Sequence, residues 1–126
     1  MSEAVLFPDV ELLVCNLLRN PILGLPVGIK VPTTRPAEFI RILRTGGVTE
    51  SIRSEAAQIT VEAWAQSEQR ASFILSQCRA IINRAEGSLF GARELSGPIN
   101  LPDPTTAQIR YTMSFQIRAR GAALTV

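Results

Sequence analysis

The feature of this sequence that most constrains its fold is an alternation of apolar and polar side chains along residues 107–120. The apolar side chains occupy odd positions without a break: Ile109, Tyr111, Met113, Phe115, Ile117 and Ala119. Successive side chains of a β-strand point to opposite faces, so the pattern predicts a strand with one buried and one solvent-facing side. At roughly 3.3 Å per residue it would run about 43 Å, comparable with the diameter of a globule of this length. We therefore expect it to cross the domain, to bend at a bulge or to protrude toward a partner.

The length and composition indicate one globular domain, residues 1–126, with 46% hydrophobic residues to form its core. The net charge of +2, from 13 basic and 11 acidic residues, is too balanced to indicate binding to nucleic acid or to an anionic membrane. All basic residues except Lys30 are arginine. Arginine is enriched at protein interfaces because its planar group forms paired hydrogen bonds. A GC-rich coding genome gives the same bias, and we weight the two explanations equally.

The remaining composition indicates a soluble product made in a cytoplasm. Cys15 and Cys78 lie in separate helical patterns without metal-ligand spacing, so we expect buried, reduced thiols. The N-terminus carries Glu3 and no basic region, so no secretory signal is expected. No apolar run approaches the length of a membrane span.

The first third of the chain is divided by proline and glycine. Residues 8–19 predict a helix with Pro8 at its first position, and Pro21 prevents its continuation. The prolines and glycines that follow leave room for a short strand over 27–31, which proline restricts to the edge of a sheet.

The next segments predict a hairpin with a long loop. Residues 38–44 are apolar on both faces of a strand, so both faces should be covered, one of them in part by another subunit. Residues 45–55 contain Gly46 and Gly47 and too few apolar groups to fold onto the core, which predicts a mobile hairpin loop. Residues 57–65 resume the alternation, and Trp64 falls on the solvent-facing side, where it needs a neighbour or a partner.

The second half predicts a helix and two strands. Ser67 is a suitable N-cap for a helix that ends at Gly87, and residues 89–95 predict a strand before the final one. The expected fold class is therefore α+β, with two helices packed on one face of a mostly antiparallel sheet of four to five strands.

The sequence offers little for chemistry. It contains no histidine, which removes the commonest general base and the usual catalytic triads. Gly46-Gly47 has neither the spacing nor the following helix of a phosphate-binding loop, and scattered carboxylates such as Glu50 and Glu55 are expected to be solvated. No catalytic residue, cofactor or metal ligand is expected.

The outward arginines of the final strand, Arg110, Arg118 and Arg120, admit two interpretations. A basic stripe can follow a phosphate backbone, but no aromatic residues alternate with these arginines for base stacking. We therefore favour a solvated strand face or a subunit contact over direct nucleic-acid binding.

The order of these features resembles the tail terminator proteins of long-tailed bacteriophages, particularly those of actinobacterial hosts. The resemblance covers nearly the whole chain as an ordered series of strand-edge patterns. After the first helix and short strand, the series is Pro36 to Ile42 running into Gly46-Gly47, Ile59 to Ala65, an alanine-rich helix, Gly97-Pro98, Pro102-Asp103-Pro104 and a closing strand from Arg110 to Gly121.

The resemblance implies a structural virion protein without catalytic residues. Such proteins form a ring, typically a hexamer, on the last ring of the tail tube, stop tube growth and offer their other surface to the head–tail connector. Genomic DNA passes through the lumen without specific binding, no membrane is involved, and the ring lies at the head-proximal end of the tail after assembly in the host cytoplasm. The residues expected at subunit or partner contacts are Arg41, Arg44, Gly46, Gly47, Glu50, Arg53, Trp64, Arg110, Arg118 and Arg120.

Three alternatives remain open at this point. Another phage neck or tail-completion protein could share the pattern. A small ligand-binding or enzymatic α+β domain would need a desolvated Glu62 or Glu94 in a deep apolar pocket. A DNA-binding module would show steeply salt-dependent binding to duplex DNA.

Overall fold

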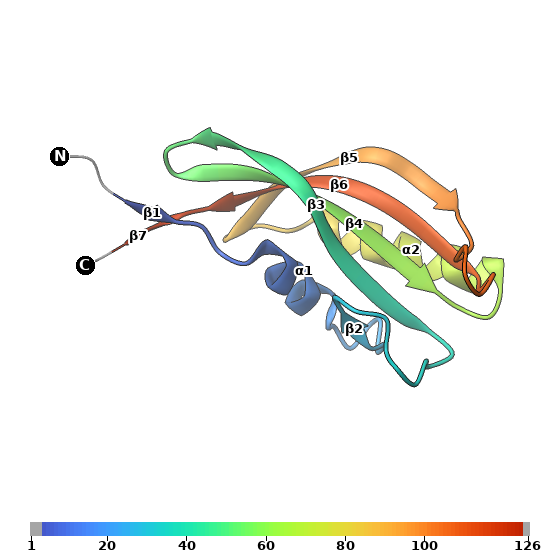
Figure 1. The fold of residues 1–126 in the computed structure, drawn as a ribbon. Coiled ribbons are helices and arrows are strands. Elements are labelled where there is room, and N and C mark those ends of the chain that lie inside the picture. Colours follow the sequence, from blue (N-terminus) through green and yellow to red (C-terminus); the bar gives the residue numbers. More distant parts are fainter. Residues whose placement is uncertain (1–3, 125–126) are drawn as a thin grey trace.

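The computed structural model describes residues 4–124, and it confirms the α+β class. Two helices, α1 (Val10–Leu18) and α2 (Glu68–Asn83), pack on one face of a five-stranded sheet (Figure 1). A second sheet of two short strands, β1 (Val5–Leu6) and β7 (Ala122–Ala123), pairs the two ends of the described chain. Glu3 lies outside the described residues.

The main sheet has the strand order β2-β3-β4-β6-β5. Its strands are β2 (Val27–Gly28), β3 (Phe39–Ser51), β4 (Ser54–Trp64), β5 (Leu89–Asn100) and β6 (Arg110–Arg120). Neighbouring strands are antiparallel except for β2 and β3. The strand expected at 27–31 is therefore at an edge, as predicted, but only two residues of it pair.

The core lies between the sheet and the helices, and the odd positions of β6 form its centre. Met113, Phe115, Ile117 and Ala119 are all buried, which confirms the prediction made from the alternation. They lie beside the odd positions of β4, with Phe115 opposite Ile59. The strand begins at Arg110 rather than at 107, because Ala107 adopts a positive φ of 57° that interrupts extended backbone.

The helix starts follow from local capping. Asp9, not Pro8, borders α1, and its Oδ1 accepts a hydrogen bond from the backbone N–H of Leu12 at 3.2 Å. The cap predicted for the second helix is confirmed, since Ser67 Oγ accepts from the N–H of Arg70 at 3.2 Å. Helix α2 ends at Asn83, before the predicted stop at Gly87.

The prediction of a long loop over residues 45–55 is wrong. Strand β3 continues to Ser51 and β4 starts at Ser54, so only Ile52 and Arg53 lie between the two strands. This polar segment has no apolar face of its own. Backbone hydrogen bonds to β4 hold it in the sheet. Strand β5 is likewise longer than the predicted 89–95 and runs through Pro98 at the sheet edge.

The molecule has two distinct ends (Figure 1). We call one the hairpin end; it contains the β3–β4 turn and the β1–β7 pair. We call the other the loop end; it contains residues 29–38, which lead into β3, and residues 101–109, which lead into β6. The two ends differ in how deeply their charged side chains are buried.

Candidate interaction surface

The sheet face turned away from the helices, here called the open face, carries the outward arginines. The register of β4 and β6 places Arg110 beside Trp64, Arg118 beside Ala56 and Arg120 beside Ser54. The odd positions of both strands point into the core, so these even positions share the opposite face. The structure thus brings together Arg110, Arg118, Arg120 and Trp64 of the predicted contact residues on one face.

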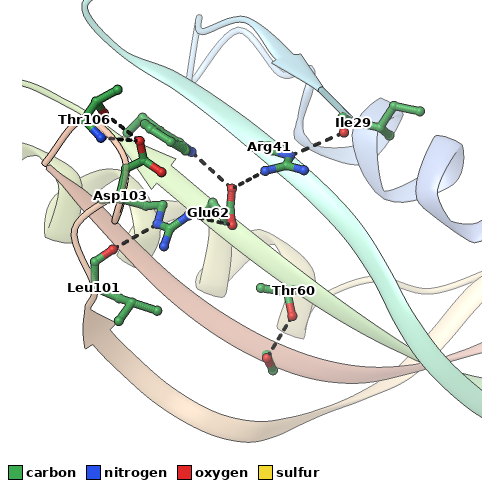
Figure 2. Close-up of polar contacts among 10 residues, drawn as sticks. Ile29, Arg41, Thr60, Glu62, Leu101, Asp103 and Thr106 are labelled. Carbon is green, nitrogen blue, oxygen red and sulfur yellow. Dashed lines mark hydrogen bonds and ion pairs between the residues drawn. The ribbon is translucent and has the colours of Figure 1, made fainter. Parts of the chain in front are cut away.

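At the loop end, a buried carboxylate organises the open face. Glu62 is 5% exposed, and Figure 2 shows three groups converging on it. The indole Nε1 of Trp64 donates to its Oε1 at 3.2 Å, and Arg110 Nη1 donates to its Oε2 at 3.4 Å. Arg41 Nη1 forms an ion pair with Oε1 at 3.5 Å. Arg41 and Arg110 therefore hold a buried negative charge that would otherwise be costly to desolvate.

Trp64 meets its neighbours within the chain. It is 1% exposed and stacks on Phe39, with ring centroids 5.1 Å apart and planes inclined by 18°. The guanidinium groups of Arg35 and Arg110 lie 5.6 and 5.3 Å from the centroid of its ring. The expectation that another subunit covers the second face of residues 38–44 is therefore wrong at Phe39, which Trp64 covers.

The same arginines fix the loops at this end (Figure 2). Arg41 Nε donates to the carbonyl oxygen of Ile29 at 3.4 Å, and Arg110 Nε donates to that of Leu101 at 2.9 Å. Within the second loop, Asp103 Oδ2 accepts from the hydroxyl of Thr106 at 2.6 Å, and this bond lowers the pKa of Asp103 below its ordinary value. Glu62 thus positions two loops through the two arginines that it binds.

At the hairpin end, arginine and glutamate side chains also form ion pairs, but these pairs are more exposed to solvent. Arg118 forms a two-pronged ion pair with Glu50, Nε to Oε1 at 2.6 Å and Nη2 to Oε2 at 3.2 Å, which lowers the pKa of Glu50. Arg120 lies 4.1 Å from the ring centroid of Phe90 and donates to the carbonyl oxygen of Gly87 at 2.6 Å. The side chains of Arg118 and Glu50 are 37% and 33% exposed, so they remain accessible to a partner.

Arg44 lies apart from the open-face arginines, whereas Arg53 lies near Arg120. Arg44 follows Ile42, a core residue, by two positions and binds Glu55 through two hydrogen bonds of 3.1 and 3.0 Å. Its backbone N–H also donates to Glu11 of α1 at 2.8 Å, which places it on the helix side. Arg53 lies in the exposed turn and, with Arg120, lines a hollow of about 390 Å³.

Gly46 and Gly47 shape the strand instead of forming a flexible turn. Their φ angles of 148° and 144° are rare for residues with a side chain. They follow a register shift between Arg44 and Gly46. A Cβ on Gly47 would lie 2.4 Å from the carbonyl oxygen of Ala56, whereas a Cβ on Gly46 would meet nothing within 4 Å. Close approach to β4 therefore requires glycine at 47.

The open face is more basic than the whole chain. Six arginines and three acidic residues lie on or beside it: Arg35, Arg41, Arg93, Arg110, Arg118, Arg120, Glu50, Glu62 and Asp103. This local excess of positive charge is larger than the net charge of +2 for the sequence. The nearly balanced charge of the whole sequence therefore does not hold for the open face. Long-range attraction of anions would be concentrated at this face.

Arginine side chains bind Glu62 and Glu94, the two carboxylates named for an enzymatic alternative. Arg79 and Asn83 both donate to Glu94, which lowers its pKa, and Glu62 is held as described above. A hollow of about 560 Å³ at the start of α2 contains Glu38, but Arg70 binds that carboxylate at 2.6 Å and lowers its pKa. Within residues 4–124 no three His, Cys, Asp or Glu side chains gather as metal ligands.

Both cysteines are buried, free thiols, as expected. Burial raises the pKa of Cys78 to about 12 and also raises that of Cys15. The thiolate, which is the nucleophilic form, is therefore disfavoured at both positions.

Sequence reasoning missed the central role of Glu62. Its signal is weak: Glu62 and Trp64 share one face of a predicted strand because they are two residues apart. The two arginines come from β3 and β6, and only the register shows that Arg41 lies opposite Glu62 and that Arg110 lies opposite Trp64.

No protein-family model matches the chain, and no curated protein matches it. Among the described residues, no helix is long and apolar enough to cross a membrane.

Proposed function

We propose that this chain is a tail terminator of a long-tailed bacteriophage, a non-enzymatic protein whose working form is a ring. The observation that carries the proposal is the ordered series of sequence features from Pro36 to Gly121 that resembles this family. The chain has the α+β fold, with two helices on one face of a mostly antiparallel sheet, that its sequence features predicted.

In this proposal the ring, most simply a hexamer, caps the tail tube and ends tube polymerisation. One surface contacts the tail tube protein, and the other joins the tail to the head–tail connector. The genome passes through the lumen during ejection, and the protein resides in the virion at the head-proximal end of the tail. A head-to-tail ring is a heterologous assembly, so the two contact surfaces of each subunit differ.

The exposed groups of the hairpin end support an assembly role. Arg118, Glu50 and Arg53 retain accessible surface there, and Ile52 is 66% exposed in the same turn. An exposed apolar side chain beside arginines is typical of contact surfaces. The carboxylates that a small enzymatic domain would require, Glu62 and Glu94, are both held by arginine side chains.

The proposal is tested by growing tail tubes in vitro. Purified tail tube protein of the same phage is polymerised with and without this chain, and tube lengths are measured by electron microscopy. We expect shorter tubes that carry an extra ring at one end. Unchanged lengths and bare tube ends would contradict the proposal.

A further inference from the structure

Within residues 4–124, the main sheet has one free edge along β5 and another along the part of β3 beyond its short pairing with β2. Strand β2 pairs with β3 only at Ile40 and Arg41, so no strand of the described chain lies against the outer side of β3 beyond that point. Strand β5 is last in the strand order and pairs only with β6. Uncovered strand edges offer unpaired N–H and C=O groups, which readily pair with another strand.

Groups from β2 and α1 contact the first half of the outer side of β3, and no strand of residues 4–124 pairs with its second half. The N–H of Ile40 donates to the carbonyl oxygen of Pro26 at 2.9 Å, and the N–H of Arg44 donates to Glu11 at 2.8 Å. Both N–H groups therefore point away from β4, and N–H direction alternates along a strand. One extra residue at the register shift after Arg44 moves the outward N–H groups to Gly47 and Thr49.

The strand directions allow one copy to continue the sheet of another. Each of the pairs β3–β4, β4–β6 and β6–β5 is antiparallel, so β5 runs opposite to β3. If a second copy stands beside the first in the same orientation, β3 of one copy is antiparallel to β5 of the other. The alternation of strand directions then continues from subunit to subunit.

Exposed apolar side chains lie on the same two edge strands. Val48 on β3 is 63% exposed and Leu95 on β5 is 42% exposed. Both line a hollow with Gln58 and Gln116, which places them on the open face. These exposed apolar side chains lie on the open face beside the two free strand edges, where a neighbouring copy would cover part of them.

We propose that subunits assemble by edge-to-edge strand pairing, with residues 45–51 of β3 in one copy hydrogen-bonded to β5 of the next. This inference rests on the proposed ring and identifies its subunit contact. The two edges are different surfaces of one chain, so the contact is heterologous and repeats in one rotational direction. The hairpin-end half of β5, from Leu89 to Glu94, contains one of the three register shifts, whereas the other two and Pro98 follow it, so this half is the more regular partner.

A proline at position 49 tests the pairing directly. Thr49→Pro removes an N–H that points away from β4, so the hairpin itself keeps its ladder while the outer edge loses a donor. The matched control Thr49→Ala keeps the N–H. Light scattering in the presence of tail tube protein should show rings for the wild type and for T49A, and at least tenfold weaker assembly for T49P, with unchanged circular dichroism.

Amide hydrogen exchange on the wild type provides a second measurement that needs no variant. On ring formation, the amides of Gly47 and Thr49 should become protected, while Val48, which donates to β4, is protected in both states. Rings from T49P at wild-type concentrations, or no new protection at 47 and 49, would overturn the pairing and leave the terminator function intact. A wild type that forms no ring even with tube protein would instead overturn the proposed function.

Discussion

The two ends of the open face contain the same residue types in different environments. At the loop end, Glu62 is 5% exposed and Trp64 is 1% exposed, and both lie among arginines that also hold loop carbonyls. At the hairpin end, Glu50 and Arg118 form a closer ion pair, at 2.6 Å, but each side chain is about a third exposed. Geometry alone therefore does not distinguish a structural ion pair from an accessible one.

The burial of the charged groups distinguishes the ion pairs at the two ends. An exposed pair gains little from its attraction because water already solvates both charges, and its net contribution is typically small. A buried charge that loses its partner cannot recover hydration, so breaking such a pair costs much more. The loop end is thus expected to carry stability, whereas the hairpin end offers charged groups for contacts.

The largest expected effect comes from removing the charge at the loop end. Glu62→Gln keeps an acceptor for the Trp64 indole but leaves Arg41 and Arg110 without their shared carboxylate. We expect a loss of about 2–4 kcal/mol in the free energy of unfolding, measured by urea denaturation. The matched variant at the hairpin end is Glu50→Gln, which should leave the urea midpoint within experimental error.

These two variants test the comparison sharply. Equal losses for E62Q and E50Q would show that burial does not separate the two ends. The amides of Ile29 and Leu101 should also exchange faster in E62Q, because their loops are anchored through Arg41 and Arg110.

A smaller effect is expected from the glycines of β3. Gly47→Ala adds a Cβ that would lie 2.4 Å from a backbone oxygen, whereas Gly46→Ala adds one in open space. Both residues have positive φ angles, so the difference between the variants isolates the steric clash. We expect about 2 kcal/mol or more of destabilisation for G47A and about 1 kcal/mol for G46A, measured by thermal unfolding. Indistinguishable melting temperatures for the two variants would contradict the close approach of β3 to β4.

The sequence predicted those parts of the fold that depend on neighbouring residues alone, such as the alternation along a strand and the cap of a helix. The alternation identified β6 and its buried odd positions, and the cap at Ser67 located the start of α2. The segment 45–55 was misread as a loop because side-chain composition gives no measure of backbone pairing. Its strand is held by hydrogen bonds to β4, which is itself held by β6.

The candidate surface could be predicted only in part. Alternation on one strand correctly placed Arg110, Arg118 and Arg120 on one face. The burial of Trp64 by Phe39 and the convergence of two arginines on Glu62 depend on strand register across β3, β4 and β6. Register is set by the packing of the whole sheet, so a single strand pattern does not reveal it.

The most direct test of the proposed ring is the mass of the wild-type protein in solution. Light scattering over a range of concentrations, alone and with tail tube protein, would measure it. We expect a ring-sized species in at least one condition, most simply six copies of the chain. A monomer in both conditions, together with unchanged tube growth, would contradict it.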